Sequence, residues 1–400
     1  MKRHDVLILG GGAGGITVAA RLQRADRDLD VAIVEPSRDH WYQPLWTLVG
    51  GGVVTAEATR RDEASLIPKG VTWIQEAATT IDPDAKTVTL QDGTQIGYDQ
   101  LVVAVGIAYD WDKVAGLRDA VGKNGVVSNY LPHLAETTWQ ELQAFEGGKM
   151  VFTNPSGQIK CGGAPQKIMY LAEHYTRKRG IRDDTEIIGA FAGTVMLGVP
   201  EINATLNDIV EKRDIHMHFH RDLVAVDGDA KTATFAVTGD LDAPHVTMDY
   251  DFMHVTPPMR APDLIAGSGL EKADGPHAGF VDVDPHTLRH ARYPDVWAIG
   301  DVGAIPTAKT GAAVRKQAPV LVDHLLAHRA GTSSDKVYDG YSSCPLVTGY
   351  GSLVLAEFLY DNTYKPTFPI DQTKERWDMY MLKRHLLPPM YWQGMLRGLA

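Results

Sequence analysis

The chain has 400 residues, of which 44% are hydrophobic and 22% charged, and this is the composition of a globular protein with room for two or three domains. Its formal net charge of -11 argues against nucleic acid as a general partner, because phosphate binding requires a positive surface. Only two cysteines are present, which excludes the disulfide framework of a small secreted protein. Small molecules are therefore the expected ligands.

The N-terminal sequence MKRHDVLILGGGAGG places basic residues before a short apolar run that ends in glycines. This run is shorter than the apolar core of a secretory signal peptide. No stretch elsewhere reaches the roughly 18 apolar residues that a membrane-spanning helix requires. We therefore expect neither a signal peptide nor a transmembrane helix.

A glycine-rich turn follows the first predicted strand and leads into a helix of small residues, in the pattern G-x-G-x-x-G. Such a turn lets a pyrophosphate approach the N-terminus of the helix closely. A second predicted strand ends in Glu35, about twenty residues further on, where a carboxylate can bind ribose hydroxyls. The sequence thus predicts a dinucleotide site. The loop residues expected to form it are Gly10, Gly12, Ala13, Gly14 and Gly15.

Two later segments identify the dinucleotide by resemblance. The sequences DQLVVAVGIAYD, around Gly106, and PDVWAIGDVGAIPTAKTGAAVRKQ, with Asp301, resemble the later signatures of flavoproteins of the glutathione reductase type. In that family the aspartate contacts the ribitol of FAD, and the following helix points its N-terminus at the flavin. The resemblance implies FAD as the resident cofactor. Without the first motif, Asp301 would be read as a turn residue or helix cap.

These motifs predict an α/β fold with two Rossmann-like domains of the glutathione reductase type and a C-terminal membrane-interfacial segment. Residues 1–110 and 290–330 should form a discontinuous FAD-binding domain. Residues 111–289 should form a second Rossmann-like domain, and residues 331–400 a C-terminal region. Two-dinucleotide members of this superfamily carry a further G-x-G-x-x-G after the opening strand of the second domain. Here that place reads NPSGQIKCGGAPQK, with the wrong glycine spacing, so the electron donor is not expected to be NAD(P)H.

The cysteine in this turn has neighbours suited to reactivity. Gly162 and Gly163 allow a sharp bend, and Pro165 should begin a helix, so Cys161 lies just before a helix N-terminus. The helix dipole and the nearby Lys160 should lower the pKa of its thiol. A small buried cysteine at a crowded turn is the alternative. The second cysteine, Cys344, also precedes a proline and is expected in a loop.

Taken together, the chain resembles the two-cysteine branch of the sulfide:quinone oxidoreductases over nearly its whole length. The resemblance implies a membrane-associated FAD enzyme that oxidises hydrogen sulfide and passes two electrons to a quinone. Some bacterial members use a third cysteine, which this chain lacks. The segments that carry the resemblance are HWYQPLWTLVGGG (40–52), KCGGAPQKIMYLAEHY (160–175), FMHVTPPMRAPD (252–263), GDVGAIPTAKT (300–310) and YDGYSSCPLVTGY (338–350).

The same resemblance implies the roles of particular residues. Sulfide would attack a disulfide or polysulfide bridge between Cys161 and Cys344 at Cys344, leaving a persulfide there and a thiolate on Cys161. The sulfur would then leave to sulfite, glutathione or another sulfide. The residues implied in FAD binding besides the glycine loop are Glu35, Gln43, Ala78, Gly106, Asp301 and Lys309.

The C-terminal sequence DMYMLKRHLLPPMYWQGMLRGLA sets apolar and aromatic residues beside basic ones, as in an interfacial membrane segment. Its two prolines should split it into two short helices. The family favours a peripheral location at a bacterial cytoplasmic or mitochondrial inner membrane, whereas the sequence alone allows a helix packed on the core or in a homo-oligomer contact. Tyr350 and Phe358 are candidates for the quinone pocket, with core packing as the alternative.

Several histidines carry weaker signals. His216, His218 and His220 should share one face of a strand, but no cysteine or carboxylate completes an obvious zinc site, so no metal is expected. His40 and His254 lie in the segments that resemble the family and are candidates for proton transfer, with a packed histidine before a turn as the alternative for His254.

Three other functions stay open on the sequence. A type II NADH:quinone dehydrogenase would require a second nucleotide motif and no cysteine pair. The flavin subunit of a flavocytochrome c sulfide dehydrogenase would deliver electrons to a haem partner, against which the basic, apolar C-terminus argues. A non-catalytic FAD-containing redox sensor or interaction protein would not be bleached by sulfide.

Overall fold

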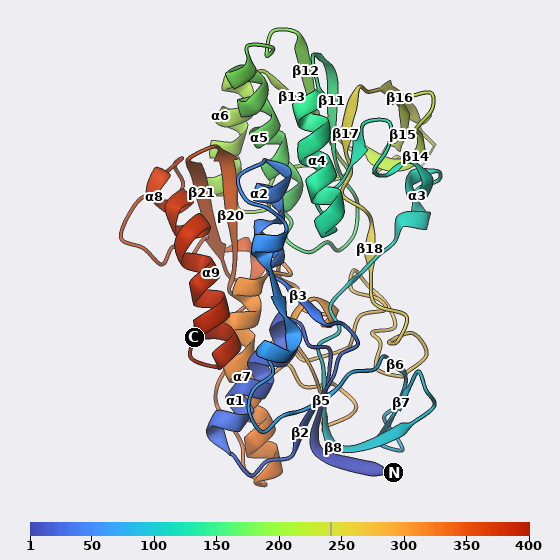
Figure 1. Ribbon diagram of the computed structural model, residues 1–400, viewed down its shortest axis with the longest axis vertical. Coiled ribbons are helices and arrows are strands. Elements are labelled where there is room, and N and C mark those ends of the chain that lie inside the picture. Colours follow the sequence, from blue (N-terminus) through green and yellow to red (C-terminus); the bar gives the residue numbers. More distant parts are fainter. Residues whose placement is uncertain (241) are drawn as a thin grey trace.

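The computed structural model describes residues 1–240 and 242–400. Two sheets organise the chain, the N-terminal sheet at the bottom of Figure 1 and the second sheet at the top. Both are built largely from parallel strands that are buried on both faces, which explains continuous apolar runs such as VAIV. The observed architecture confirms the predicted α/β fold with Rossmann-like sheets.

The N-terminal sheet has seven strands. β1 lies at its centre, parallel to β2 on one side and to β8 on the other. β19 joins this sheet from far along the chain, parallel to β8. In spatial order the strands are β5 (Thr72–Ile74), β2 (Val31–Val34), β1 (Lys2–Leu9), β8 (Gln95–Val103), β7 (Thr87–Leu90) and β6 (Ala78–Asp82), with β19 (Val296–Ala298) beside β8.

Two helices cover one side of this sheet. α1 (Ala13–Ala25) connects β1 to β2, and α7 (Gly311–Arg329) packs against α1. The start of each helix follows the carboxyl end of a parallel strand, which is where ligands bind in open α/β sheets. Both helix N-termini therefore point to the same edge of the sheet.

The second sheet is parallel throughout and receives its strands from the middle of the chain. Its strands are β10 (Val126–Val127), β17 (Phe252–His254), β11 (Gly148–Asn154), β12 (Thr185–Phe191) and β13 (Ile215–Phe219). Its helices are α4 (Pro132–Ala144), α5 (Ala164–Arg179) and α6 (Pro200–Lys212). The domain boundaries expected from the sequence remain a prediction.

We call the N-terminal sheet with α1 and α7 the N-terminal unit, and the second sheet with α4, α5 and α6 the second unit. Smaller elements complete these two units. An antiparallel sheet of β14 (Asp222–Asp227), β15 (Thr232–Ala236) and β16 (Val246–Asp249) flanks the second unit. The remaining short elements are α2 (Trp46–Gly50), α3 (Leu117–Ala120) and the pairs β3 (Asp39–Trp41) with β4 (Arg60–Asp62) and β9 (Ala108–Tyr109) with β18 (Met259–Arg260).

The chain ends in a hairpin and a helical segment. The hairpin strands are β20 (Ser342–Gly349) and β21 (Ser352–Phe358). The helical segment begins with α8 (Trp377–Met381), contains α9 (Leu387–Pro389) and ends beside α1, where Arg21 donates a hydrogen bond to the carbonyl of Ala400. Figure 1 shows this segment, in red, running alongside α7.

The expected split of this segment at its two prolines is wrong. Helical backbone continues through Pro388 and Pro389, because π-helical turns over Leu382–Leu386 and Met390–Gly394 flank them. Such wider turns accommodate prolines, which cannot donate a backbone hydrogen bond. Within residues 1–240 and 242–400, no helix combines the length and the apolar character needed to cross a bilayer.

Candidate functional site

The glycine loop between β1 and α1 shows a different requirement at each position. Gly10 has a φ of +99°, and a Cβ there would meet the carbonyl oxygen of Ala104 at 2.5 Å. A Cβ on Gly15 would lie 1.9 Å from the carbonyl oxygen of Gly10, so the close approach of helix and strand requires glycine. Gly12, the residue that caps α1, has open space within 4 Å of a Cβ position. The turn is thus folded by Gly10 and Gly15, while Gly12 leaves room for a ligand at the helix N-terminus.

Glu35 follows β2 and is held against this loop. One carboxylate oxygen accepts a hydrogen bond from the amide of Gly11, and the other from the amide of Ser37, each at 2.8 Å. The acid therefore lies at the edge where the sequence predicted a ribose contact.

A cavity of about 630 Å³ extends from this loop to the C-terminal segment. Gly10 and Gly15 shape the turn behind its wall. Ala78 pairs with Leu90 on the β6–β7 hairpin and does not line the cavity, nor do Tyr350 and Phe358. The predicted residues that line it are Gly12, Ala13, Gly14, Glu35, Gln43, Gly106, Cys161, Asp301 and Lys309.

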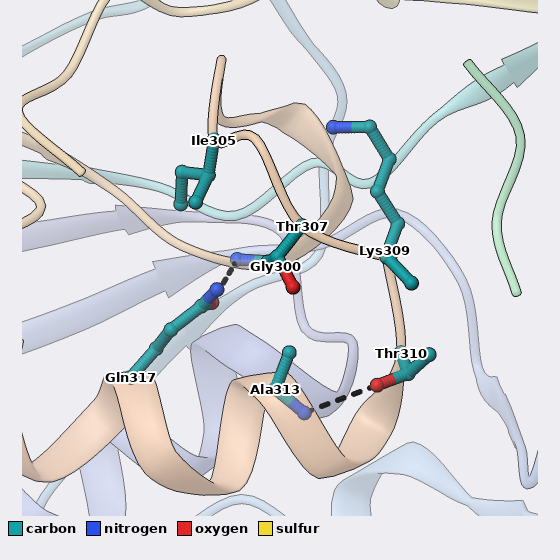
Figure 2. A pocket seen from close by; sticks show the side chains of 8 residues that line it. Gly300, Ile305, Thr307, Lys309, Thr310, Ala313 and Gln317 are labelled. Atoms are coloured by element: carbon teal, nitrogen blue, oxygen red, sulfur yellow. Dashed lines mark hydrogen bonds between the residues drawn. The ribbon is translucent and has the colours of Figure 1, made fainter. Parts of the chain in front are cut away.

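The start of α7 forms another part of the wall. Figure 2 shows the Thr310 side chain accepting a hydrogen bond from the amide of Ala313, and the amide of Gly300 donating to Gln317. These contacts fix the turn that carries Asp301 against the helix. Burial raises the pKa of the Asp301 carboxyl, and the Lys309 ammonium opposes that rise.

Lys309 connects this turn to the cysteine loop. Its Nζ donates to the carbonyls of Asp301 and Gly303, at 2.6 and 2.9 Å. Its own carbonyl accepts the amide of Cys161 at 2.9 Å. Cys161 has a φ of +55°, a left-handed conformation that is uncommon for residues other than glycine and is often found at functional sites.

The two sulfur atoms meet across the boundary between the second unit and the hairpin. Cys161 Sγ lies 3.7 Å from Cys344 Sγ, and both are free thiols. Cys344 is fully buried in β20, so its expected place in a loop is wrong. A two-stranded hairpin tolerates the following proline, Pro345, because each strand has an edge without ladder hydrogen bonds.

The two thiols differ in pKa because their charged and hydrogen-bonded neighbours act on them differently. The hydrogen bond between the two sulfur atoms, together with the Lys167 ammonium, holds the pKa of Cys161 well below its ordinary value. The same interaction, with burial, raises the pKa of Cys344. Lys167 Nζ lies 3.2 Å from Cys161 Sγ. Lys160, the lysine named from the sequence, instead contacts Gln43 and the Tyr109 hydroxyl.

Another lysine reaches the cavity from the C-terminal segment. Lys383 is 3% exposed, and its Nζ donates to the carbonyl of Pro44 at 3.0 Å. Burial, and to a lesser extent the charge of Lys167, lower the pKa of Lys383 to about 7. Sequence reasoning named neither Lys167 nor Lys383 as a site residue. Lys167 could have been found, because it falls on the first turns of the helix that follows Cys161.

His40 joins three segments that are distant in sequence. Its Nδ1 makes a hydrogen bond of 3.0 Å to Glu63, and its Nε2 one of 2.5 Å to the Tyr391 hydroxyl. All three side chains are buried on the cavity wall. This contact attaches the C-terminal segment to the N-terminal unit.

The histidines near β13 do not form the single face that was expected. The strand ends at Phe219, and His220 adopts a left-handed conformation with its Nδ1 hydrogen-bonded to the carbonyl of Thr238. His216 and His218 alone share a face of the strand. Among residues 1–240 and 242–400, no group of three histidine, cysteine or acidic side chains is arranged to hold a metal ion.

Comparisons with known proteins establish the family and the fold of this chain. The family signature described as pyridine nucleotide-disulphide oxidoreductase matches residues 4–133. A solved structure of the sulfide:quinone oxidoreductase from Aquifex aeolicus superposes with a TM-score of 0.83 at 22% identity, covering 99% of this chain and 92% of its own, which shows the likeness of fold.

Two curated relatives align over nearly the entire length. A protein of Mus musculus named mitochondrial sulfide:quinone oxidoreductase is 44% identical, covering 99% of this chain and 87% of its own. A protein of the same name from Dictyostelium discoideum is 42% identical, covering 98% of this chain and 86% of its own. At this identity and coverage, the chain belongs to the sulfide:quinone oxidoreductase family.

Proposed function

We propose that this protein oxidises sulfide at a redox pair formed by Cys161 and Cys344 and passes two electrons through FAD to a quinone. The observation that carries the proposal is the 3.7 Å approach of the Cys344 sulfur to the sulfur of Cys161, which lines the cavity that begins at the glycine loop. A small movement suffices to bring thiols at this separation into a disulfide.

The residues present fit FAD. The open space at Gly12 lies at the N-terminus of α1, where backbone amides favour a pyrophosphate. Glu35, which lines the cavity beside this helix, supports binding of the ribose hydroxyls, and the N-terminus of α7 faces the same cavity. When bound, FAD supplies the two-electron carrier between the sulfur atoms and the quinone.

The cysteines divide the sulfur chemistry between them. In the oxidised pair, HS⁻ attacks Cys344 Sγ, a new sulfur–sulfur bond forms there, and the bond between the two cysteines breaks. Cys161 leaves as a thiolate, and Cys344 carries the persulfide Cys344–S–SH. Lys167 and the N-terminus of α5 favour this division, because the better leaving group is the thiol with the lower pKa.

The turn between β11 and α5 argues for sulfide rather than NADH as the electron donor. Cys161 occupies this turn, at the carboxyl edge of the second sheet, where a nicotinamide dinucleotide motif would stand. A type II NADH:quinone dehydrogenase needs that motif and does not need the adjacent thiols.

The proposed function also includes a sulfur acceptor and a contact with a membrane. The persulfide sulfur passes to a small nucleophile such as sulfite, glutathione or another sulfide. The protein attaches to a bacterial cytoplasmic or mitochondrial inner membrane through its C-terminal segment, which exposes Trp377, Leu386 and Met390. The mitochondrial names of the relatives agree with the second of these locations.

An anaerobic titration tests the function. Sulfide should bleach the flavin absorbance of the holoenzyme, a quinone should restore it, and NADH should leave it unchanged. Replacement of either cysteine by serine should abolish bleaching by sulfide while FAD content stays the same. Bleaching by NADH, or full sulfide turnover in either variant, would reject the proposal.

A further inference from the structure

The carboxyl edge of the second sheet presents three buried polar side chains to the cavity. Asn129 and Tyr130 follow β10, and His254 ends the neighbouring strand β17. They are 8%, 5% and 1% exposed. All three line the cavity that contains Cys161. The edge of an open α/β sheet at which strands end is a usual place for a ligand.

Their polar atoms lack hydrogen-bond partners among the described residues. These atoms are Nδ2 and Oδ1 of Asn129, the hydroxyl of Tyr130 and Nδ1 of His254. Buried polar groups are nearly always hydrogen-bonded, and leaving one without a partner is costly. Four such atoms in one wall indicate a place built for a polar ligand.

The available groups are mainly donors. His254 Nε2 accepts the amide of Asn129 at 3.0 Å, so the neutral ring carries its proton on Nδ1. Burial lowers the pKa of His254 to about 3, which keeps the ring neutral at working pH. The imidazole N–H, the tyrosine hydroxyl and the asparagine amide can therefore each donate a hydrogen bond to an anion in the cavity.

This wall is adjacent to the sulfur atoms. Burial raises the pKa of the Tyr130 hydroxyl, the neighbouring Thr256 hydroxyl opposes this rise, and the nearby thiol groups of Cys161 and Cys344 add to it. The Lys160 ammonium lies 5.8 Å from the centre of the Tyr130 ring, which adds a positive charge at the edge of the wall.

We propose that Asn129, Tyr130 and His254 form a subsite that binds hydrosulfide, HS⁻, before it attacks Cys344, an inference that rests on the proposed function. The three donors hold the sulfur anion, and Asn129 Oδ1 accepts its S–H. The subsite selects a small monoanion, because its donors are neutral and enclosed. Binding there orients the nucleophile toward the cysteine pair and involves no change in its protonation.

Two variants test the subsite in the holoenzyme. Tyr130→Phe and Asn129→Leu each remove donors while keeping the volume of the side chain nearly constant. The matched control is Tyr250→Phe, which removes a similarly buried hydroxyl that has no hydrogen-bond partner in the described part of the chain and lies outside the cavity lining. Flavin bleaching is followed by rapid anaerobic mixing over a range of sulfide concentrations.

Each test variant should raise the sulfide concentration for half-maximal bleaching about tenfold, as expected for one lost hydrogen bond to an anion, with a smaller change in the limiting rate. The control should match the wild type. An unchanged concentration dependence in both test variants would overturn the subsite. Loss of FAD from them would also overturn it, because the donors would then serve the cofactor. Failure of the wild type itself to bleach would instead reject the proposed function.

Discussion

Lys167 on the second turn of α5 directs its ammonium at the sulfur of Cys161, three residues before the helix, with 3.2 Å between Nζ and Sγ. Lys167 is 4% exposed, so water screens this charge little. The ammonium therefore favours the thiolate form of Cys161, whose backbone amide is held by the carbonyl of Lys309.

Replacing Lys167 by methionine should raise the pKa of the Cys161 thiol. An opposite charge at this distance typically lowers a pKa by one or more, so the midpoint of the pH dependence of alkylation should move upward by about one pH unit. Iodoacetamide labelling of the reduced protein, read by mass spectrometry at Cys161, measures this midpoint. Lys178→Met, at the exposed end of the same helix, should leave it in place. Equal midpoints in both variants would show that the ammonium does not act on the thiol.

The features that the sequence predicted well depend on short-range geometry. The positive φ of Gly10 and the close approach at Gly15 are requirements of one turn, and the residues within that turn reveal them. The same holds for the bend at Cys161, where two glycines and a proline follow directly. Local sequence is sufficient for such features because their steric cause is local.

The features that it missed depend on contacts between distant segments. Tyr391 meets His40 across 351 positions, and no pattern near either residue reveals the other. Lys160 is the neighbour of Cys161 in sequence, yet its side chain points toward Gln43, while Lys167 returns to the thiol along the helix. Side chains of adjacent residues point in different directions, whereas a side chain in the first turns of a helix can point back toward a residue that precedes the helix.

Two glycines of the same loop should respond in opposite ways to alanine. Gly12→Ala should leave the stability of the apoprotein close to wild type, since its Cβ meets open space, but should weaken FAD retention. Gly15→Ala places a Cβ 1.9 Å from the carbonyl oxygen of Gly10 and should destabilise the fold by about 2 kcal/mol or more. Thermal unfolding of the apoproteins and FAD content after dialysis separate the two effects. A Gly12→Ala protein that retains FAD normally would contradict the placement of the pyrophosphate.

Removal of the Tyr391 hydroxyl should loosen the C-terminal segment. Tyr391→Phe leaves the buried Nε2 of His40 without its partner, at a cost of about 1–3 kcal/mol. Amide hydrogen exchange over residues 377–400 should accelerate accordingly. Tyr380→Phe, on the same segment, should accelerate it less. Equal exchange in both variants would mean that packing alone attaches the segment.

Lys383 should make stability depend on pH. Its pKa in the folded protein is about 7, below its ordinary value of 10.5, so between these values the unfolded chain binds the proton that the buried amine has lost. The free energy of unfolding therefore rises with pH between about 7 and 10.5, and below pH 7 the burial of the charged amine lowers it by the full amount. Lys383→Met should raise the free energy of unfolding by about 2 kcal/mol at pH 6 and by much less near pH 10. Thermal unfolding across this range measures it, with the exposed Lys374→Met as control. A gain that is equal at both pH values would contradict the assigned cause.

The exposed apolar side chains of the C-terminal segment should determine membrane attachment. Trp377 and Leu386 are 66% and 62% exposed, a state that costs free energy in water and that the interfacial region of a bilayer relieves. Leu386→Glu should weaken sedimentation with anionic vesicles about tenfold, because it replaces a favourable transfer of about 1–2 kcal/mol by an unfavourable one. Val337→Glu offers a matched control, since Val337 is 61% exposed but lies outside the segment. Turnover with a water-soluble quinone should persist in both variants. Vesicle binding that falls equally in both would show that attachment does not occur through the C-terminal segment.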